Sequence, residues 1–302
     1  MTIFQAIILG IVQGLTEFIP VSSTAHLIFA SRALQLFEGQ ALRAEQTTAT
    51  IAVIQLGTLA AVLVYFARDI LAITVAFVRD HRAILRWRPR PAGVRAAGGA
   101  AVRNPPRLSD EARLGWLVII GSLPVGVVGL LFKKQIEGTF TKNLWVIATM
   151  MIVIALLLAL AERVGRRERV MKDLYLRDAL AVGGAQVLAL VPGASRSGST
   201  IMGGLFAGET RETAARFSFL LSMPAIAASG LLELKEALHR LPPASGLPLL
   251  VATVVSGLVG YASIWFLLRY LRTHSTAVFI LYRLALGGTL LLLLWRGVIQ
   301  AV

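Results

Sequence analysis

The stretch QGLTEFIPVSSTAH, residues 13–26, decides how this chain can fold. It places a carboxylate, several hydroxyl groups and a histidine at the junction of two apolar segments, residues 1–19 and 23–36. Neither segment is an uninterrupted apolar run of the roughly 20 residues that a helix needs to cross a bilayer. Polar backbone at membrane depth is tolerated only where protein or a water-filled cavity covers it. We therefore expect residues 1–36 to form a re-entrant helical hairpin.

The composition of the whole chain indicates a membrane protein. The 302 residues are 56% hydrophobic and 15% charged, with a mean hydropathy of +0.74. In a soluble domain about a quarter of the residues are charged, which is well above the fraction found here. We therefore expect a single all-α polytopic membrane domain over residues 1–302. The absence of cysteine excludes disulfides, a thiol nucleophile and Cys-ligated metals. Charge-poor runs predict transmembrane helices at 48–66, 114–132, 143–161, 214–234, 248–268 and 276–295.

A second polar break, PGASRSGST at residues 192–200, has surroundings similar to the first. Each unit contains Gly-x-x-Gln, an apolar turn, a proline and a Ser/Thr cluster. The order indicates an internal repeat, with halves at 1–162 and 178–302 and a second re-entrant hairpin at 178–207. Because three spans per half is an odd number, we expect the second half to be inverted relative to the first. Three pairs of residues share an offset of 173: Gly10 and Gly183, Gln13 and Gln186, Ser22 and Ser195.

The net charge of +14 is concentrated in two basic segments, residues 67–113 and 163–177. Such segments mark the cytoplasmic side of a polytopic protein, which places the N-terminus outside. The expected partners are therefore bilayer lipids and not nucleic acid. Proline and glycine between Arg79 and Arg107 predict an irregular stretch within the first basic segment, which we expect to be a cytoplasmic loop.

Glu17 is the acidic residue that the predicted hairpin places deep in the membrane. Its spacing from Gln13 is i, i+4, so both side chains share one face of a helix. An ionisable group at this depth is costly and indicates a functional site. The alternative is an interfacial carboxylate that reaches water.

The residues after Pro20 predict an anion-binding helix N-terminus. Ser22, Ser23 and Thr24 have the side chains of N-cap residues, and the free N–H groups of such a terminus attract anions. His26 lies three residues beyond Ser23, so its ring could reach that hydroxyl or a bound phosphate. The alternatives are helix packing by small residues and a histidine satisfied in the interior.

The second break adds positive charge to this arrangement. Ser195 can cap the next helix, and Thr200 follows one turn after Arg196. The planar fork of Arg196 suits two phosphate oxygens, and an arginine at this depth needs an anionic partner. Arg283, in the last predicted span, is a weaker candidate because its side chain could extend to the membrane surface.

Both breaks resemble the signatures of the undecaprenyl-diphosphate phosphatase family, also called the bacitracin-resistance protein family. Residues 13–26 match a pattern in which (E/Q)xxxE precedes PVSSTxH, and residues 192–200 match PGxSRSxxT. An Ile-Leu-Tyr segment before Arg283 extends the resemblance toward the end of the chain. The pattern admits Glu or Gln at its first position, and this chain has the uncharged Gln13 there.

The resemblance implies a multi-pass protein of the bacterial inner membrane that hydrolyses undecaprenyl diphosphate to undecaprenyl phosphate and inorganic phosphate. This reaction recycles the carrier lipid for peptidoglycan synthesis and confers bacitracin resistance. The resemblance also implies a site that opens to the periplasm. A different class of function, a transporter or flippase of lipid-linked phosphate, stays open because inverted repeats with broken helices are typical of transporters. A homodimer is also open.

We expect Glu17, Ser23, His26 and Arg196 to carry the catalysis. Either Ser23 attacks phosphorus with help from His26, or Glu17 and His26 activate water. A divalent cation, Mg²⁺ or Ca²⁺, is expected near the oxygens of Glu17 and Gln13, although Gln13 leaves it without a second carboxylate. The residues expected to contact the substrate phosphates are Ser22, Thr24, Ser195, Ser197, Thr200 and Arg283.

Overall fold

A computed structural model describes residues 1–34, 42–87, 107–132, 143–240 and 246–301, with side chains except at 42–49, 229 and 231–240. These residues form helices joined by short turns, and no strand occurs within the described ranges. The helices are α1 (Ile3–Phe18), α2 (Ser23–Ala33), α3 (Leu42–Tyr65), α4 (Ala67–Arg86), α5 (Asp110–Leu131), α7 (Leu144–Val164), α8 (Leu176–Val187), α9 (Arg196–Phe206), α10 (Arg211–Arg240), α11 (Gly246–Leu271) and α12 (Ala277–Trp295). Two short 3-10 turns, η2 (Met171–Asp173) and η3 (Leu188–Leu190), flank α8.

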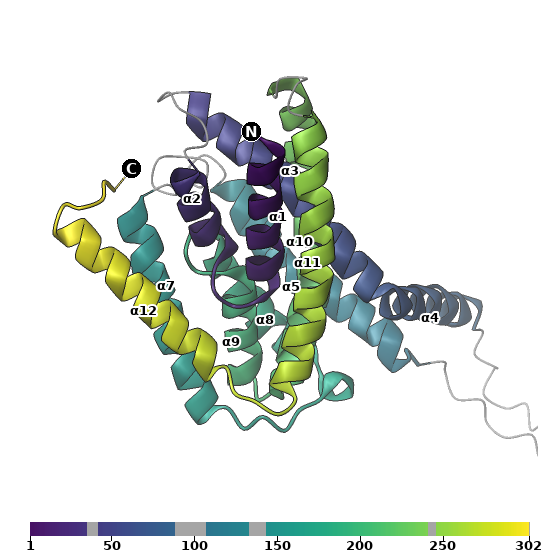
Figure 1. Cartoon of the computed structure of the whole chain (residues 1–302). Helices are drawn as coiled ribbons and strands as arrows, with labels where there is room; N and C mark the ends of the chain where they lie inside the picture. The colour runs from purple at the N-terminus through teal and green to yellow at the C-terminus, as the bar shows by residue number, and fades with distance from the viewer. Residues whose placement is uncertain (35–41, 88–106, 133–142, 241–245, 302) are drawn as a thin grey trace, which may run out of the picture.

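The predicted all-α membrane architecture is confirmed. Helices α5, α7, α11 and α12 are each long and apolar enough to cross a membrane. The predicted spans 48–66 and 214–234 fall largely within α3 and α10. Most of the helices run side by side in one bundle (Figure 1). The long helices expose large apolar side chains, such as Leu130, Leu258 and Leu281, that lipid contact would cover.

The two predicted hairpins share one backbone design. In each, a helix ends before a proline, and a second helix of 11 residues begins after a serine with a positive φ angle. That angle is 80° at Ser22 and 70° at Ser195. Residues other than glycine rarely adopt it, and strained backbone of this kind is concentrated at functional sites. The turn between α1 and α2 lies about midway along the bundle (Figure 1).

Each hairpin packs against a helix from the other half of the chain. Gly10 of α1 lies so close to α11 that a Cβ atom would stand 2.6 Å from the carbonyl oxygen of Ala252. Gly183 of α8 lies equally close to α5, where a Cβ atom would stand 2.2 Å from the carbonyl oxygen of Gly121. These matching contacts agree with an internal repeat. The inversion of the halves across the membrane stays a prediction.

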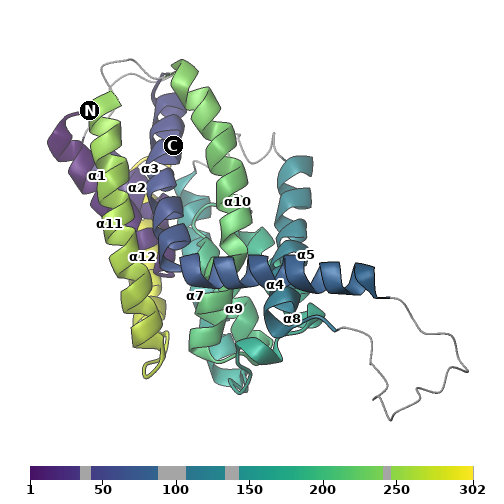
Figure 2. The same ribbon diagram turned by 90° about the vertical axis from the view of Figure 1, so that its right-hand side faces the viewer.

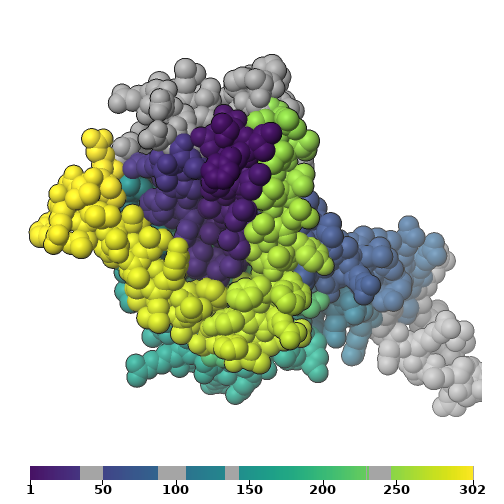
Figure 3. Space-filling view, in the orientation of Figure 1, coloured from purple at the N-terminus to yellow at the C-terminus, as the bar shows by residue number. Residues whose placement is uncertain are grey.

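The hairpin α1–α2 lies at the edge of the bundle between α12 and α11 (Figure 3). The outer face of α1 exposes apolar side chains at helical spacing, Phe4, Ile7, Ile11 and Leu15. Its inner face ends in Phe18, which packs edge-on against Phe219 of α10 at 5.3 Å between ring centroids. This packing fixes the last turn of α1, where Glu17 lies.

The irregular stretch predicted between Arg79 and Arg107 is helical up to Arg86, and the cytoplasmic location of residues 67–113 stays a prediction. Residues 67–86 form the helix α4, which bends by 67° from α3 and lies across the bundle (Figure 2). Leu71, Val75 and Val78 expose one apolar face of α4, and basic residues occupy other positions. The sequence prediction considered only the number of arginines in this segment and overlooked the helical spacing of its apolar residues. The predicted irregular residues 88–106 lie outside the described ranges.

Candidate active site

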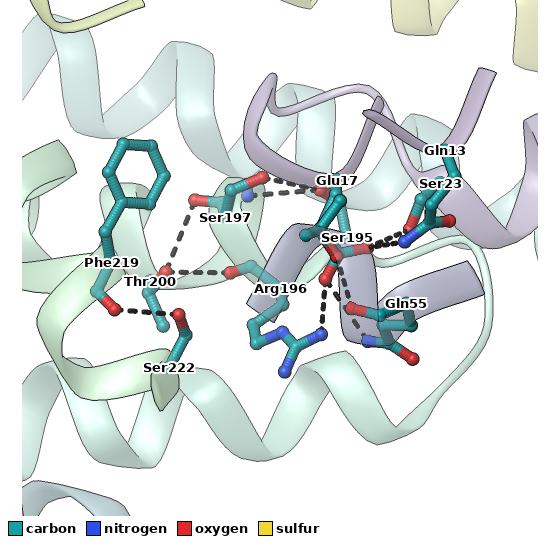
Figure 4. A network of polar contacts seen from close by, with 12 residues as sticks. Gln13, Glu17, Ser23, Gln55, Ser195, Arg196, Ser197, Thr200, Phe219 and Ser222 are labelled. Carbon is teal, nitrogen blue, oxygen red and sulfur yellow. Dashed lines mark hydrogen bonds and ion pairs between the residues drawn. The ribbon is translucent and has the colours of Figure 1, made fainter. Parts of the chain in front are cut away.

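Glu17 lies where the two helix breaks meet, and both of its carboxylate oxygens accept hydrogen bonds (Figure 4). The side chain is buried on the last turn of α1. Oε1 accepts from Arg196 Nη2 at 2.6 Å and Gln55 Nε2 at 3.3 Å, while Oε2 accepts from Ser23 Oγ at 2.8 Å and Gln13 Nε2 at 3.0 Å. The shared face predicted for Gln13 and Glu17 is confirmed. One carboxylate therefore joins α1, α2, α3 and α9.

Arg196 begins α9 and forms an ion pair with Glu17 across the two hairpins. Its predicted anionic partner is thus a side chain of the protein. Its side chain is 21% exposed, and in the described part of the chain only Nη2 has a hydrogen-bond partner. The Nε and Nη1 donors are therefore available to phosphate oxygens.

Ser23 begins α2 and donates its hydroxyl hydrogen to Glu17. A serine becomes a nucleophile when an adjacent base takes its proton. The base within hydrogen-bond distance of Ser23 is Glu17, whereas the expected partner was His26.

His26 has different neighbours from those that its sequence position indicates. Its Nδ1 lies 2.7 Å from the carbonyl oxygen of Ser22, and its Nε2 lies 2.6 Å from the hydroxyl of Tyr282. A carbonyl oxygen only accepts, so Nδ1 carries a proton. In the neutral ring Nε2 then accepts the hydrogen of Tyr282, whose ring stacks on the imidazole at 5.6 Å. The backbone of Ser22, which has a positive φ angle, thus directs its carbonyl oxygen toward Nδ1 of His26.

The two serines that precede α2 and α9 differ in their side-chain contacts. Ser195 Oγ accepts from the N–H of Gly198 at 3.2 Å, so the predicted cap of α9 is confirmed. Ser22 makes no side-chain cap, contrary to expectation, and its buried Oγ has no hydrogen-bond partner in the described structure. The first N–H groups of α2 therefore have no side-chain acceptor from Ser22.

The remaining hydroxyl candidates lie in three different environments. Thr24 is exposed beside Ser23. Ser197 is buried and lies 3.2 Å from Ser195 through their Oγ atoms. Thr200 is fully buried, donates to the carbonyl oxygen of Arg196 and contacts the hydroxyl of Ser218 on α10. Thr200 thus packs toward α10, so its predicted phosphate contact stays a prediction without support from this geometry.

Arg283 is fully buried, and its side chain holds both helix breaks in place. Nη1 donates to the carbonyl oxygen of Pro20 at 3.2 Å, and Nη2 donates to those of Gly193 and Ala194 at 2.9 and 3.0 Å. Nε donates to the carbonyl oxygen of Met151 in α7 at 3.1 Å. Because carbonyl groups occupy all three nitrogens, this geometry favours a structural role over the predicted phosphate contact.

Two residues at the site did not figure in the sequence prediction, Gln55 and Tyr282. Gln55 contacts Glu17 from α3, and a polar amide within the predicted span 48–66 could have signalled it. Tyr282 contacts His26 from α12 across 256 residues of sequence. Its position next to Arg283 was the available signal.

The residues present do not fit a cation site built by the protein alone. Among the described residues no group of three His, Asp or Glu side chains is placed to hold a metal. Both oxygens of Glu17 already accept two hydrogen bonds each. Gln13 Oε1 is buried without a partner and is the remaining oxygen beside them. Mg²⁺ requires about six oxygen ligands.

Comparison with known proteins assigns the chain to a family. Residues 6–289 match the family described as bacitracin resistance protein BacA. A protein of Syntrophobacter fumaroxidans named undecaprenyl-diphosphatase is 50% identical over 98% of this chain and 99% of its own length. Proteins of the same name from Chlorobium phaeobacteroides and Myxococcus xanthus are 47% and 45% identical, over 100% and 98% of this chain and 100% and 91% of their own lengths. The chain belongs to the bacitracin resistance protein BacA family.

Proposed function

We propose that this protein is an integral membrane phosphatase that hydrolyses undecaprenyl diphosphate to undecaprenyl phosphate and inorganic phosphate. The observation that carries the proposal is the joint contact of Ser23 and Arg196 with Glu17. A nucleophile, a base and a cation for phosphate thus lie within one hydrogen-bonded group. Relatives that match over nearly their whole length have the name undecaprenyl-diphosphatase. The activity would recycle the carrier lipid and so give bacitracin resistance.

In the proposed complex, the terminal phosphate lies between the N-termini of α2 and α9. The free N–H groups of α2 and the Nε and Nη1 donors of Arg196 would bind its oxygens. Thr24 and Ser195, at the same two termini, are further candidates for phosphate contacts. Phosphoryl transfer depends mainly on such positioning and neutralisation of charge.

We further propose that Ser23 is the nucleophile and Glu17 its base. Ser23 Oγ attacks the terminal phosphorus, its proton passes to Glu17, and the bond from phosphorus to the bridging oxygen breaks. The lipid monophosphate leaves and Glu17 returns the proton to it. Water then attacks the phosphoserine, loses a proton to Glu17, and Ser23 regains a hydrogen as phosphate departs. The alternative is direct attack by water that Glu17 and His26 activate.

The ion pair of Glu17 with Arg196 would change when substrate binds. Arg196 Nη2 lies 2.6 Å from Glu17 Oε1, and a bound phosphate would compete for the same guanidinium group. Glu17 would keep its contact with Ser23 through Oε2 while Arg196 contacts the phosphate.

A divalent cation, Mg²⁺ or Ca²⁺, is a separate proposal. Such an ion would enter with the diphosphate, whose oxygens supply most of its ligands, with Glu17 and Gln13 as the protein oxygens nearest to it. No step of the reaction above depends on it. Phosphate release in the presence of EDTA, with and without added Mg²⁺ or Ca²⁺, tests this proposal.

The decisive experiment is phosphate release from a long-chain polyprenyl diphosphate by the full chain purified in detergent. Release at enzymatic rates without a membrane gradient supports the phosphatase. No release, together with transport of lipid-linked phosphate in vesicles, would support the flippase alternative.

We also propose an inner-membrane location with the N-terminus and the site on the periplasmic side, and a homodimer as the assembly. The absence of cysteine makes the orientation testable with single cysteines at Thr2 and Arg167. In intact cells with a permeabilised outer membrane, an impermeant maleimide should label position 2 and not position 167. The molar mass of the detergent-solubilised protein tests the dimer.

A further inference from the structure

A cavity of about 510 Å³ lies at the far end of α9 from the active site. Its walls come from the turn after α7, the first turns of α8 and the end of α9. Arg196 begins α9, and Phe206 at its other end lines this cavity. Eleven helical residues at 1.5 Å each separate the two sites by about 16 Å. The cavity is therefore distinct from the proposed active site.

The base of the cavity is electrically balanced. Arg169 and Asp178 form a two-fold ion pair in which each guanidinium Nη atom binds one carboxylate oxygen. Arg169 also donates to the carbonyl oxygens of Asp173 and Ala207. This group ties the start of α8 to the end of α9 and leaves no free charge on either partner.

Two further arginines of the cavity are not neutralised in this way. Arg166 has no ion pair or hydrogen bond within the described residues. The side chain of Arg177 is 77% exposed, and its Nε lies 4.0 Å from Asp178, which already pairs with Arg169. Glu168 is the remaining acidic residue of the lining. The lining thus contains three arginines and two acidic residues, and the one positive charge in excess favours the binding of an anion.

The N-terminus of α8 does not add to this charge. Arg177 is the second residue of α8, and Asp178 in the same turn already accepts the backbone N–H of Tyr175. The attraction for an anion therefore comes from the arginine side chains.

The cavity also has an apolar wall at the end of a membrane-spanning helix. Phe206 and Val164 line it and remain 43% and 57% exposed. Val164 is the last residue of α7, so the cavity lies where a span reaches the headgroup region. Free phosphate would use only the arginines, whereas a lipid would use the arginines and the apolar wall.

We propose that this cavity binds the phosphate headgroup of an anionic phospholipid. The phosphate lies between Arg166 and Arg177, and an acyl chain covers Phe206 and Val164. Basic pockets at the ends of membrane helices bind lipid headgroups by this combination of charge and apolar contact. This lipid is a second ligand, separate from the substrate at Glu17.

The test uses the full chain in neutral detergent and measures the binding of phosphatidylglycerol by native mass spectrometry. Arg166→Gln combined with Arg177→Gln should weaken its apparent affinity by roughly tenfold or more, since two cations are lost. The matched control, Arg82→Gln with Arg86→Gln, removes the same charge from exposed positions of α4 and should retain most of the affinity. Equal affinity in the wild-type and cavity variants would overturn the proposal.

Two further arms separate the possible sources of phosphate. Phe206→Ala should weaken phosphatidylglycerol binding, and inorganic phosphate at equal concentration should not displace the lipid. Displacement by inorganic phosphate, with no effect of Phe206→Ala, would show that the cavity is a site for free anions and would overturn the lipid assignment. All these variants should release phosphate from polyprenyl diphosphate at the wild-type rate, so failure here is distinguishable from failure of the proposed activity.

Discussion

The two helix breaks have the same backbone and different chemistry. Ser22 and Ser195 both have positive φ angles, and each precedes a helix of 11 residues. The first residue of that helix is Ser23 in one break and Arg196 in the other. The first break thus supplies the hydroxyl group and the second supplies the cation. Both side chains meet at Glu17.

Their capping contacts differ as well. Ser195 caps α9 through Gly198, whereas Ser22 leaves α2 without a side-chain cap. A capped terminus is held in place, and an uncapped one retains N–H donors for a ligand. In the proposed mechanism the two breaks therefore divide one reaction between them: the break before α9 binds rigidly and the break before α2 reacts. The following variants test that division.

Ser23→Ala should produce the largest effect. A methyl group cannot attack phosphorus, so turnover should fall by about 10⁴-fold or more if Ser23 is the nucleophile. Phosphate release from polyprenyl diphosphate measures this, and trapping of a labelled phosphoenzyme in the wild type gives a direct check. A loss of only a few-fold would assign the attack to water and make the first break a binding element as well.

Glu17→Gln should lower turnover by roughly 10² to 10⁴-fold, because the amide cannot accept the proton of Ser23. The protein should remain folded and inserted, since removal of a charge from the membrane lowers the cost of insertion. Gln13→Glu makes the reverse isosteric exchange one helical turn away; it removes one hydrogen bond to Glu17 but leaves the carboxylate of Glu17 in place. If the Glu17 variant unfolds while its remaining folded molecules keep full activity, Glu17 is structural.

Lysine variants of Arg196 and Arg283 compare the roles of these two arginines. In Arg196→Lys the ammonium group keeps the charge but loses the fork for two phosphate oxygens, so turnover should fall by about 10²-fold in a folded protein. Arg283→Lys should instead lower the free energy of unfolding by about 2 to 5 kcal/mol, because buried carbonyl groups lose their donors. Activity assays and thermal unfolding in parallel distinguish these outcomes. The reverse pattern would exchange the roles assigned to the two arginines.

The sequence predicted the elements that follow from local pattern. Apolar runs and two polar breaks were sufficient to predict the positions of the helices other than α4 and the shared face of Gln13 and Glu17. Contacts between distant segments could not be derived in this way. To predict the structural role of Arg283 one would need the positions of Pro20 and Gly193, which belong to different halves of the chain. Similarly, nothing local predicts that Ser22 directs its carbonyl group toward His26.

Tyr282→Phe tests one of those distant contacts. Loss of the hydroxyl removes the hydrogen bond to Nε2 of His26 while the stacked ring remains. If Tyr282 positions His26, turnover should fall by about tenfold and the pH profile should change shape. An unchanged pH profile with a small loss of turnover would limit Tyr282 to packing, and the first break would then work without α12.

Glu209→Gln should change stability without changing activity, because Glu209 lies in the turn after α9 and far from Glu17. Burial, with a contribution from Asp178, raises the pKa of Glu209 from 4.5 to about 8, and neither of its oxygens has a hydrogen-bond partner in the described structure. Between these two values the unfolded chain is ionised and folding must take up a proton. Stability should therefore fall as the pH rises from about 4.5 to about 8 and then level off.

The glutamine variant should lose the part of this slope that Glu209 contributes. Thermal unfolding at intervals between pH 5 and pH 8 measures the slope, and Glu168→Gln, which changes an exposed neighbour, is the matched control. Phosphate release should be the same in both variants. If Glu209→Gln keeps the full slope, another group takes up the proton. If Glu209→Gln lowers turnover, the far end of α9 influences Arg196 at its beginning. The binding role assigned to the second break would then belong to the whole of α9.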